Sequence, residues 1–407
     1  MMTNIFNNKN LNEVILLLPF TFSFALMIWF EGASKVLVIT TVISLLSFCI
    51  SFRERLKITL IDNIRQPFHI LIWVFTLFIF VQSVLHGVSS REIRALLCLS
   101  VIALYFPFRA IQFSYYQILI FLGCCTIFSN SVYLYSIVGT GRWSGVINSI
   151  PYAGLAALLA LISINFALDS KTNRLRLLFG FFSTLPIISL VITESRGVWL
   201  AFACALLVLF FNKFRFTFKK VALLLILLSS VVFVLSGSFV EQRIEQTRYE
   251  FEQIQKGNMN TSIGLRVQMW RAAVKLADGN WLLGLGNEHF EKLELLYKQR
   301  KITKALYDYH PPHYHNQFID SVVKSGLIGL AFLLLLLMLP LYLVRHTNKN
   351  TKNIVTSVVA LYVVMGVTDA PFYNGQTFIL YVLTMLIFIN TSTQSSTQTT
   401  NVRLSGA

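Results

Sequence analysis

Three histidines lie within the heptapeptide HPPHYHN, residues 310–316, directly before a long apolar run. Histidine titrates near neutral pH, so His315, next to that run, could act as a general base. The histidines could also bind a metal, but a zinc site usually needs a further ligand, and Asp308 is the one acid nearby. His310 and His313 could equally be interfacial histidines beside aromatic residues. The segment therefore points first to proton transfer.

Two arginines outside the apolar runs could bind an anionic group. Arg196 ends the sequence TESR in a very short connection between two apolar runs, so its charge should lie at the membrane boundary. Arg266 lies in the sequence TSIGLRVQMWR, where Ser262 could cap a helix and Trp270 would share the face of Arg266. The plain alternatives are solvated arginines, with Arg196 paired to Glu194. A guanidinium group fits a phosphate through its planar fork of donors.

Two acids and a further arginine complete the candidates. Asp369, in the sequence VTDAP between two late apolar runs, could orient a histidine or pair with an arginine, and it could equally cap the next helix. Asp320 and Lys324 are one helical turn apart and could simply pair with each other. Arg142, in the sequence GRW, could also reach a phosphate.

The elements that must position these residues are membrane helices. The chain has 407 residues, of which 55% are hydrophobic and 13% charged, and its mean hydropathy is +0.66. A soluble domain carries about 25% charged residues. This composition excludes a soluble globular protein, a disordered chain and a nucleic-acid-binding domain, so the net charge of +16 is interpreted as a topology signal. The five cysteines lie in apolar runs without zinc-type spacing, and no disulfide is expected.

Apolar runs predict an all-α polytopic membrane protein with about 12 transmembrane helices, since a spanning helix needs about 20 mainly apolar residues. The runs are continuous and do not alternate, so strands are not expected. The first run is interpreted as a retained helix, because no typical cleavage site follows it. The predicted helices are 14–30, 36–52, 68–86, 95–108, 116–138, 151–168, 175–193, 197–212, 221–238, 317–344, 353–367 and 372–390.

The loop charges predict the topology. Most lysines and arginines of the short loops fall on the side of the N-terminus, which places both termini in the cytoplasm. The predicted parts are residues 1–238 with nine membrane helices, an outer loop at 239–315, residues 316–390 with three membrane helices, and a disordered cytoplasmic tail at 391–407. The loop is expected to consist of helices that lie over the outer mouth of the bundle, without a core of its own.

This topology places the candidate arginines, histidines and Asp369 on the same outer side of the membrane, although they come from distant parts of the sequence. Arginines, a histidine and an acid at one membrane face suit an anionic, lipid-linked substrate.

The same segments resemble those of O-antigen ligases. His315-Asn316, followed after nine residues by Gly326-x-x-Gly329, resembles the pattern H-[NSQ]-x9-G-x-x-G of that family. The sequence TESR resembles its T-x-[ST]-R element, residues 262–270 resemble its S-x-G-x-R segment, and the sequence GVTD is similar to its late G-x-x-D turn. The resemblance covers the chain from about the seventh predicted helix to the end, and the first six helices match only in hydropathy.

The resemblance implies a GT-C-like fold and an inverting glycosyltransferase that needs neither a metal ion nor another cofactor. It implies an undecaprenyl-diphosphate-linked glycan as donor and a sugar hydroxyl of the lipid A–core oligosaccharide as acceptor. The large loop would then be periplasmic and the protein would lie in the bacterial inner membrane. In such a site Arg196 and Arg266 would clamp the diphosphate and His315 would take the acceptor proton. The expected substrate contacts are Arg142, Trp270, His313, Tyr314, Asn316 and Asp369, with Trp270 and Tyr314 stacking on sugar faces.

Two other functions are considered. The superfamily also holds O-antigen polymerases, which use the same lipid-linked donor but a lipid-linked acceptor, and protein O-oligosaccharyltransferases. A polysaccharide transporter or flippase would be a different class of protein, typified by internal repeats and by ionisable residues deep in broken helices. The sequence has no obvious repeat, and its notable charges cluster at one face.

Overall fold

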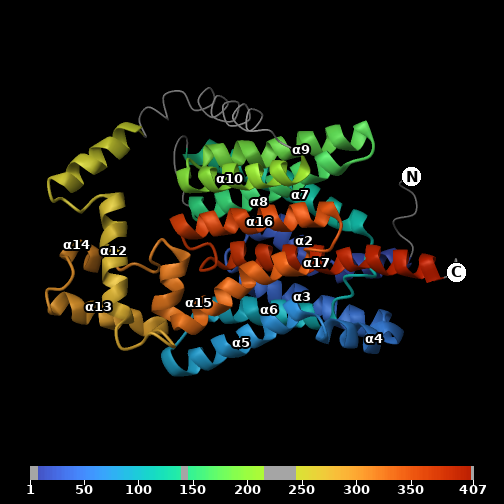
Figure 1. The fold of residues 1–407 in the computed structure, drawn as a ribbon, viewed down its shortest axis with the longest axis horizontal. Helices are drawn as coiled ribbons and strands as arrows, with labels where there is room; N and C mark the ends of the chain where they lie inside the picture. Colours follow the sequence, from blue (N-terminus) through green and yellow to red (C-terminus); the bar gives the residue numbers. More distant parts are fainter. Residues whose placement is uncertain (1–7, 139–144, 215–243, 405–407) are drawn as a thin grey trace.

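The computed structural model describes residues 8–138, 145–214 and 244–404, and these residues form helices and connecting loops without a strand (Figure 1). The helices of the first half are α1 (Asn8–Leu16), α2 (Leu18–Thr21), α3 (Ala33–Ser51), α4 (Arg53–Ile64), α5 (Pro67–His86), α6 (Ser90–Tyr105), α7 (Phe113–Val138), α8 (Ser149–Asp169), α9 (Asn173–Ile192) and α10 (Arg196–Lys213). Those of the second half are α12 (Ser262–Ala277), the 3₁₀ helix η3 (Gly286–Glu288), α13 (His289–Lys298), α14 (Lys304–Tyr309), α15 (Gln317–Leu343), α16 (Lys349–Thr368) and α17 (Gly375–Leu404).

The fold is that of an all-α polytopic membrane protein. Within the described ranges, eight helices are long and apolar enough to cross a membrane, and Leu18–Trp29 and Gly375–Thr391 are shorter apolar helices. Large apolar side chains point outward from these helices; Ile50 is 79% exposed and Val84 is 75% exposed. Such an apolar outer surface is stable only against lipid.

Most predicted helices are confirmed within a few residues. The prediction at 221–238 lies outside the described residues. The predicted helix 14–30 is interrupted, because a π-helix at Phe22–Leu26 and a 3₁₀ helix at Met27–Trp29 follow α2. The short helix α4 was not predicted, since its sequence RERLKITLIDNI is too polar to be a membrane helix. The last helix, α17, continues to Leu404, past the end predicted at residue 390.

Helix α8 forms the centre of the bundle and packs against α7, α9, α10, α16 and α17. Almost every residue between Tyr152 and Ala167 is buried. Its small side chains allow close packing, and a Cβ on Gly154 would lie 2.4 Å from the methyl carbon of Met365 in α16. This contact helps to fix α16, whose C-terminal end carries the candidate site.

Residues 262–316, here called the cap, cover one end of the bundle, and α17 runs away from them toward the other end (Figure 1). The cap has a hydrophobic cluster separate from that of the bundle, so the prediction of a loop without its own core is wrong. The cluster joins α12 and α13 to α14 and the start of α15 through Met269, Ala273, Leu276, Leu285, Leu293, Leu296, Leu306, Tyr314 and Val323.

The helix α15 is broken at Gly326, which has φ 65° and ψ −166°. Residues 281–285 of the cap cross α15 at this break: the N–H of Leu285 donates to the carbonyl of Val323 (2.8 Å), and the N–H of Leu327 donates to that of Trp281 (2.7 Å). A Cβ on Gly326 would lie 2.2 Å from the carbonyl oxygen of Leu282, so this position requires glycine. The hydrogen bonds at this break hold the first turns of α15 against the cap.

Candidate active site

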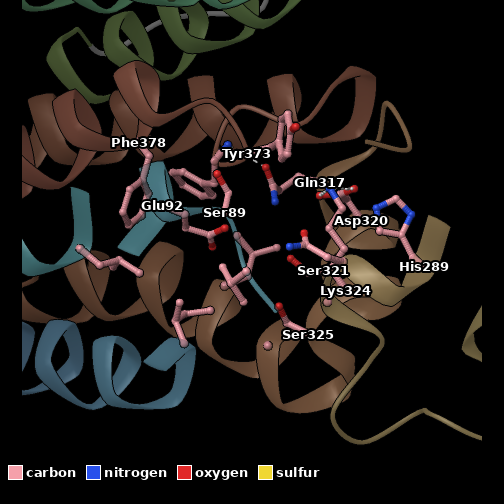
Figure 2. A pocket seen from close by; sticks show the side chains of 18 of the residues that line it. Ser89, Glu92, His289, Gln317, Asp320, Ser321, Lys324, Ser325, Tyr373 and Phe378 are labelled. Carbon is pink, nitrogen blue, oxygen red and sulfur yellow. Dashed lines mark hydrogen bonds and ion pairs between the residues drawn. The ribbon is translucent and has the colours of Figure 1, made fainter. Parts of the chain in front are cut away.

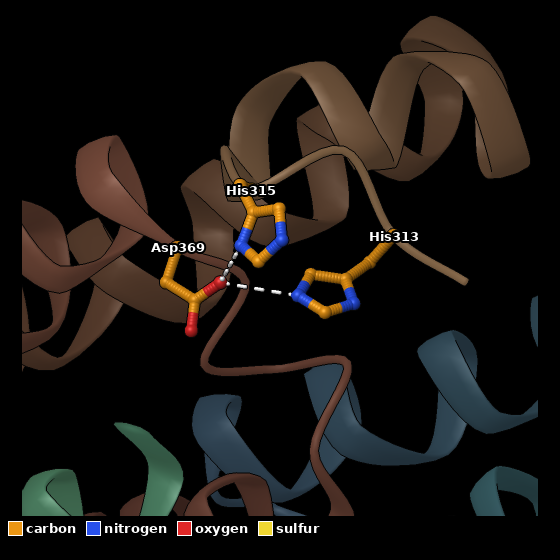
Figure 3. A group of neighbouring side chains, drawn as sticks. All are labelled: His313, His315 and Asp369. Atoms are coloured by element: carbon orange, nitrogen blue, oxygen red, sulfur yellow. Dashed lines mark hydrogen bonds and ion pairs between the residues drawn. The ribbon is translucent and has the colours of Figure 1, made fainter. Parts of the chain in front are cut away.

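The C-terminal end of α16 brings a carboxylate and two histidines together. Asp369 directly follows α16, and its backbone N–H donates to the carbonyl of Met365 (2.8 Å). Its Oδ1 lies 2.8 Å from Nδ1 of His315 and 3.1 Å from Nε2 of His313 (Figure 3). All three side chains are largely buried. Asp369 therefore orients histidines, and the alternative that it caps the last helix is wrong, since Asn374 caps α17.

Asn316 sets the position of His315. Its Oδ1 accepts hydrogen bonds from the N–H groups of Phe318 and Ile319 (3.1 Å each) and so caps the start of α15. Its Nδ2 donates to the carbonyl of Val367 in α16 (3.2 Å). Both ends of the amide bind backbone groups, so Asn316 has a positioning role, and its expected contact with the substrate stays a prediction. His315 itself has φ 46°, in the left-handed region.

The charge state of Asp369 assigns the protons of the histidines. Burial alone would raise the pKa of Asp369, but the hydrogen bonds from His313 and His315 outweigh burial and hold that pKa well below its usual value. An ionised carboxylate only accepts hydrogen bonds, so the ring nitrogens that face it donate. The proton of a neutral His315 is then on Nδ1, which leaves Nε2 as the basic nitrogen. Nε2 lies 3.3 Å from the hydroxyl of Tyr309.

Arg266 reaches the same end of α16 from the cap. It lies in the second turn of α12, and its Nη1 donates to the carbonyl of Thr368 (3.0 Å), the last residue of α16. A cation at the carboxyl end of a helix is favoured by the helix dipole. Helix α12 is capped by the side chain of Thr261, one residue before the predicted cap Ser262.

Arg196 lies at the start of α10, which packs against α16 within the bundle. It is the first residue of α10, and its Nη1 donates to the hydroxyl of Thr247 (2.6 Å), which lies in a helix at residues 244–255. The next residue, Gly197, packs against Thr368, since a Cβ there would lie 2.8 Å from Thr368 Oγ1. The backbone beside Arg196, the Arg266 side chain and the histidine–aspartate pair thus all lie at the end of α16.

Two of the predicted sugar contacts have other partners. The ring of Tyr314 is fully buried and its hydroxyl lies 3.1 Å from Nδ1 of His289, so the expectation that it stacks on a sugar is wrong. His289 is buried as well, and this burial lowers its pKa to about 3, so its ring stays neutral. Trp270 donates from Nε1 to the carbonyl of Tyr314 (3.0 Å) and borders an apolar groove between α12 and α15. Arg142 lies outside the described residues.

Sequence reasoning missed two aromatic residues beside the histidines. Tyr309 contacts His315, and Tyr373 stacks on His313 with a ring distance of 5.0 Å. Residue type does not single them out among the chain's 15 tyrosines. Their closeness to the HPPHYHN segment and to Asp369 was the one available signal. The predicted pair Asp320–Lys324 is confirmed, with a closest N–O distance of 3.0 Å.

The histidine–aspartate group also has ligand atoms that could hold a metal ion. One nitrogen from each of His313 and His315 and one oxygen of Asp369 lie within 4.8 Å of one another. Two histidines and a carboxylate are a common ligand set for zinc with an open position. In this structure the same atoms hydrogen-bond to each other, an arrangement that also suits proton transfer.

The sequence is similar to known proteins. A family model described as O-antigen ligase matches residues 181–334, which include Arg196, Arg266 and His315. An uncharacterized protein of Haemophilus influenzae is 25% identical over 407 aligned residues, which cover 94% of this chain and 99% of that protein. An O-antigen ligase of Escherichia coli K-12 is 24% identical over 226 residues, which cover 54% of this chain and 53% of that protein. Residues 181–334 thus resemble the O-antigen ligase family, and the helical membrane fold agrees with this similarity.

Proposed function

We propose that this protein is an O-antigen ligase of lipopolysaccharide biosynthesis. It would transfer the glycan of an undecaprenyl-diphosphate donor to a hydroxyl group of the lipid A–core oligosaccharide, at the periplasmic face of the inner membrane. The observation that carries the proposal is that Arg266 and the His315–Asp369 pair contact the end of α16, against which Gly197, the neighbour of Arg196, also packs. Two guanidinium groups beside a carboxylate-oriented imidazole suit the transfer of a sugar from a diphosphate to a hydroxyl group.

The arginines bind the donor. Arg196 and Arg266 would each offer a fork of N–H donors to the diphosphate, which a lysine cannot match. When the bond between the anomeric carbon and the phosphate oxygen breaks, the electron pair stays on undecaprenyl diphosphate. The two cations stabilise the negative charge that develops there, an effect that is often the largest in catalysis.

His315 activates the acceptor. Its Nε2 takes the proton of the attacking hydroxyl group while the oxygen forms a bond to the anomeric carbon on the face opposite the phosphate. Asp369 holds the Nδ1–H of His315 (2.8 Å) and stabilises the imidazolium that forms. Attack opposite the leaving group inverts the anomeric centre, and general-base help contributes roughly 10²–10⁴-fold.

The mechanism needs no metal ion. In metal-dependent transferases a cation balances the charge of the leaving phosphate, and the two guanidinium groups supply that charge here. A metal on His315 Nδ1 would also remove the hydrogen bond through which Asp369 fixes the tautomer. Metal-independent transfer therefore belongs to the proposal and is tested below by chelation.

The topology follows the loop charges. We propose that residues 1–238 and 316–390 span the inner membrane, that the loop 239–315 is periplasmic, and that the tail 391–407 is cytoplasmic. The candidate site is then on the side where lipid-linked glycans and the lipid A–core meet. The location of Arg266, His313 and His315 in the cap and of Asp369 at the adjacent helix end supports one common side.

A deletion strain tests the proposal against its closest alternative. Loss of a ligase leaves bare lipid A–core and accumulated lipid-linked polysaccharide. Expression of this chain then restores lipopolysaccharide that carries O-antigen. Loss of an O-antigen polymerase would instead leave core with a single repeat unit. A strain that loses transport but whose purified protein forms no glycosidic bond would indicate a flippase.

A further inference from the structure

A cavity lies beside the candidate site, bounded by α5, α6, the cap and the first turns of α15. Its volume is about 130 Å³, which is enough for several water molecules or for one sugar ring. The proposed transfer mechanism uses none of its polar residues. Those that carry the following argument are Ser89, Glu92, Gln317, Asp320, Lys324 and Tyr373.

Some residues in the wall of the cavity also contact residues of the candidate site. Tyr373 lines the cavity and stacks on His313 at a ring distance of 5.0 Å, with an angle of 20° between the planes. Gln317, two residues after His315, also lines it, and its Oε1 accepts a hydrogen bond from the N–H of Phe372 (2.7 Å). A molecule bound in this cavity would therefore be separated from His313 by the ring of Tyr373.

One carboxylate of the described cavity lining, Glu92, makes no hydrogen bond, although the charge of Lys324 acts on it from a distance. Figure 2 shows Glu92 extending from α6 toward the middle of the labelled side chains, with Asp320 and Lys324 of α15 on the other side. Asp320 is paired with Lys324 (3.0 Å) and accepts from the N–H of Tyr314 (3.2 Å). Among the residues that the structure describes, nothing forms a hydrogen bond or ion pair with the Glu92 side chain. Glu92 is thus available to a ligand.

The remaining walls are apolar and include several aromatic rings. Phe290, Phe372 and Tyr373 line the cavity, and the ammonium group of Lys324 lies 4.1 Å from the ring centre of Tyr373. Burial raises the pKa of Glu92, so its carboxyl group can exchange hydrogen bonds with hydroxyl groups in either charge state, and the ammonium group of Lys324 disfavours a cation. A neutral ring with hydroxyl groups at its rim and an apolar face fits both the carboxylate and the aromatic surface. These properties are those of a pyranose.

We propose that this cavity binds a sugar ring of the acceptor, with Glu92 accepting hydrogen bonds from its hydroxyl groups; the proposal rests on the proposed ligase function. Its location favours the acceptor over the donor. Arg196 begins α10, which lies on one side of α16 in Figure 1, whereas α5 and α6 lie on the other side. An inverting transfer needs the hydroxyl and the diphosphate on opposite faces of the anomeric carbon, and this arrangement provides it.

Binding of core oligosaccharide freed of lipid A, measured by calorimetry without donor, tests the proposal directly. The substitution Glu92→Gln keeps the shape of the side chain and removes its charge, so we expect the Kd to rise about tenfold or more. Ser321→Leu, which fills the cavity from α15, should weaken binding as well. In turnover, Glu92→Gln should raise the KM for the acceptor and leave the KM for the donor unchanged.

The matched control is Glu54→Gln. Glu54 is also a glutamate in the first turn of a helix, α4, but it is exposed and does not line the cavity. The Glu54→Gln variant should bind the oligosaccharide with the same Kd as the wild type. Unchanged binding by both Glu92→Gln and Ser321→Leu, or a rise in the KM for the donor alone, overturns the acceptor subsite. Wild-type binding that Glu92→Gln abolishes, without any product from donor and acceptor, would keep the subsite and refute the ligase function.

Discussion

Arg266 of the cap donates a hydrogen bond of 3.0 Å to the carbonyl oxygen of Thr368, the residue directly before Asp369. This contact joins the proposed phosphate-binding group to the element that orients the proposed base. It also satisfies a carbonyl at the end of α16 that has no partner within the helix. Arg266 therefore has a structural contact and a charge that can serve the substrate.

The first prediction concerns Arg266. Arg266→Ala should abolish glycan transfer, and Arg266→Lys should restore it only in part, because an ammonium group can hold Thr368 or the phosphate but lacks the fork that serves both. Transfer is measured as the amount of lipopolysaccharide that carries O-antigen in a deletion strain, with protein levels in the membrane as a check. Arg271→Ala is the control, since Arg271 is exposed on the same helix. Full activity in Arg266→Lys would contradict bidentate phosphate binding.

The second prediction concerns the carboxylate of Asp369. Asp369→Asn keeps the size of the side chain, but an amide can donate to His315 and so favour the wrong tautomer. The kcat should fall on the order of 10²–10⁴-fold, with a smaller change in the KM for the donor. The matched control is Asp278→Asn, at the exposed end of α12. An Asp369→Asn variant with wild-type kcat would show that Asp369 does not orient a base.

The third prediction concerns metal ions. Activity of the purified protein should survive exhaustive treatment with EDTA, because Arg196 and Arg266 supply the positive charge. Metal content before and after treatment, measured by mass spectrometry, is the control. Loss of activity that zinc or magnesium restores would instead assign His313, His315 and Asp369 to a metal site.

The fourth prediction concerns the break in α15. Gly326→Ala should destabilise the protein by more than about 1–3 kcal/mol, since the backbone angles at this position suit only glycine and the added Cβ meets Leu282. Gly180→Ala in α9 is the control: a Cβ there meets nothing within 4 Å, so stability should be unchanged or slightly raised. Thermal unfolding in detergent measures both. Equal unfolding temperatures would show that the break is not required.

The sequence predicted the helical elements well because their signal is local. A membrane helix is a continuous apolar run, and runs such as 68–86 and 175–193 coincide closely with α5 and α9. Local turn residues also agree with the structure, since α12 ends before Asp278-Gly279 and both Gly279 and Gly284 have positive φ. Family patterns also directed attention to His315 and Asp369, which the structure brings to 2.8 Å.

The remaining features depend on contacts between distant segments. Nothing in the HPPHYHN segment indicates that His313 and His315 share one oxygen of Asp369, more than fifty residues later. The burial of Tyr314 follows from the packing of α13 against α12, which no local pattern encodes. Glu92 was overlooked for the same reason: its role appears only when α6 and α15 face a common cavity.

The most direct test of the account is a reaction with purified protein, undecaprenyl-diphosphate-linked glycan and lipid A–core, followed by gel mobility of the product. The wild type should attach the glycan to the core, and His315→Ala should lose this activity by at least about 10²-fold while it still binds the donor. His346→Ala, at an exposed histidine between α15 and α16, should act as the wild type does. Near-normal attachment by His315→Ala would contradict the assignment of His315 as the base.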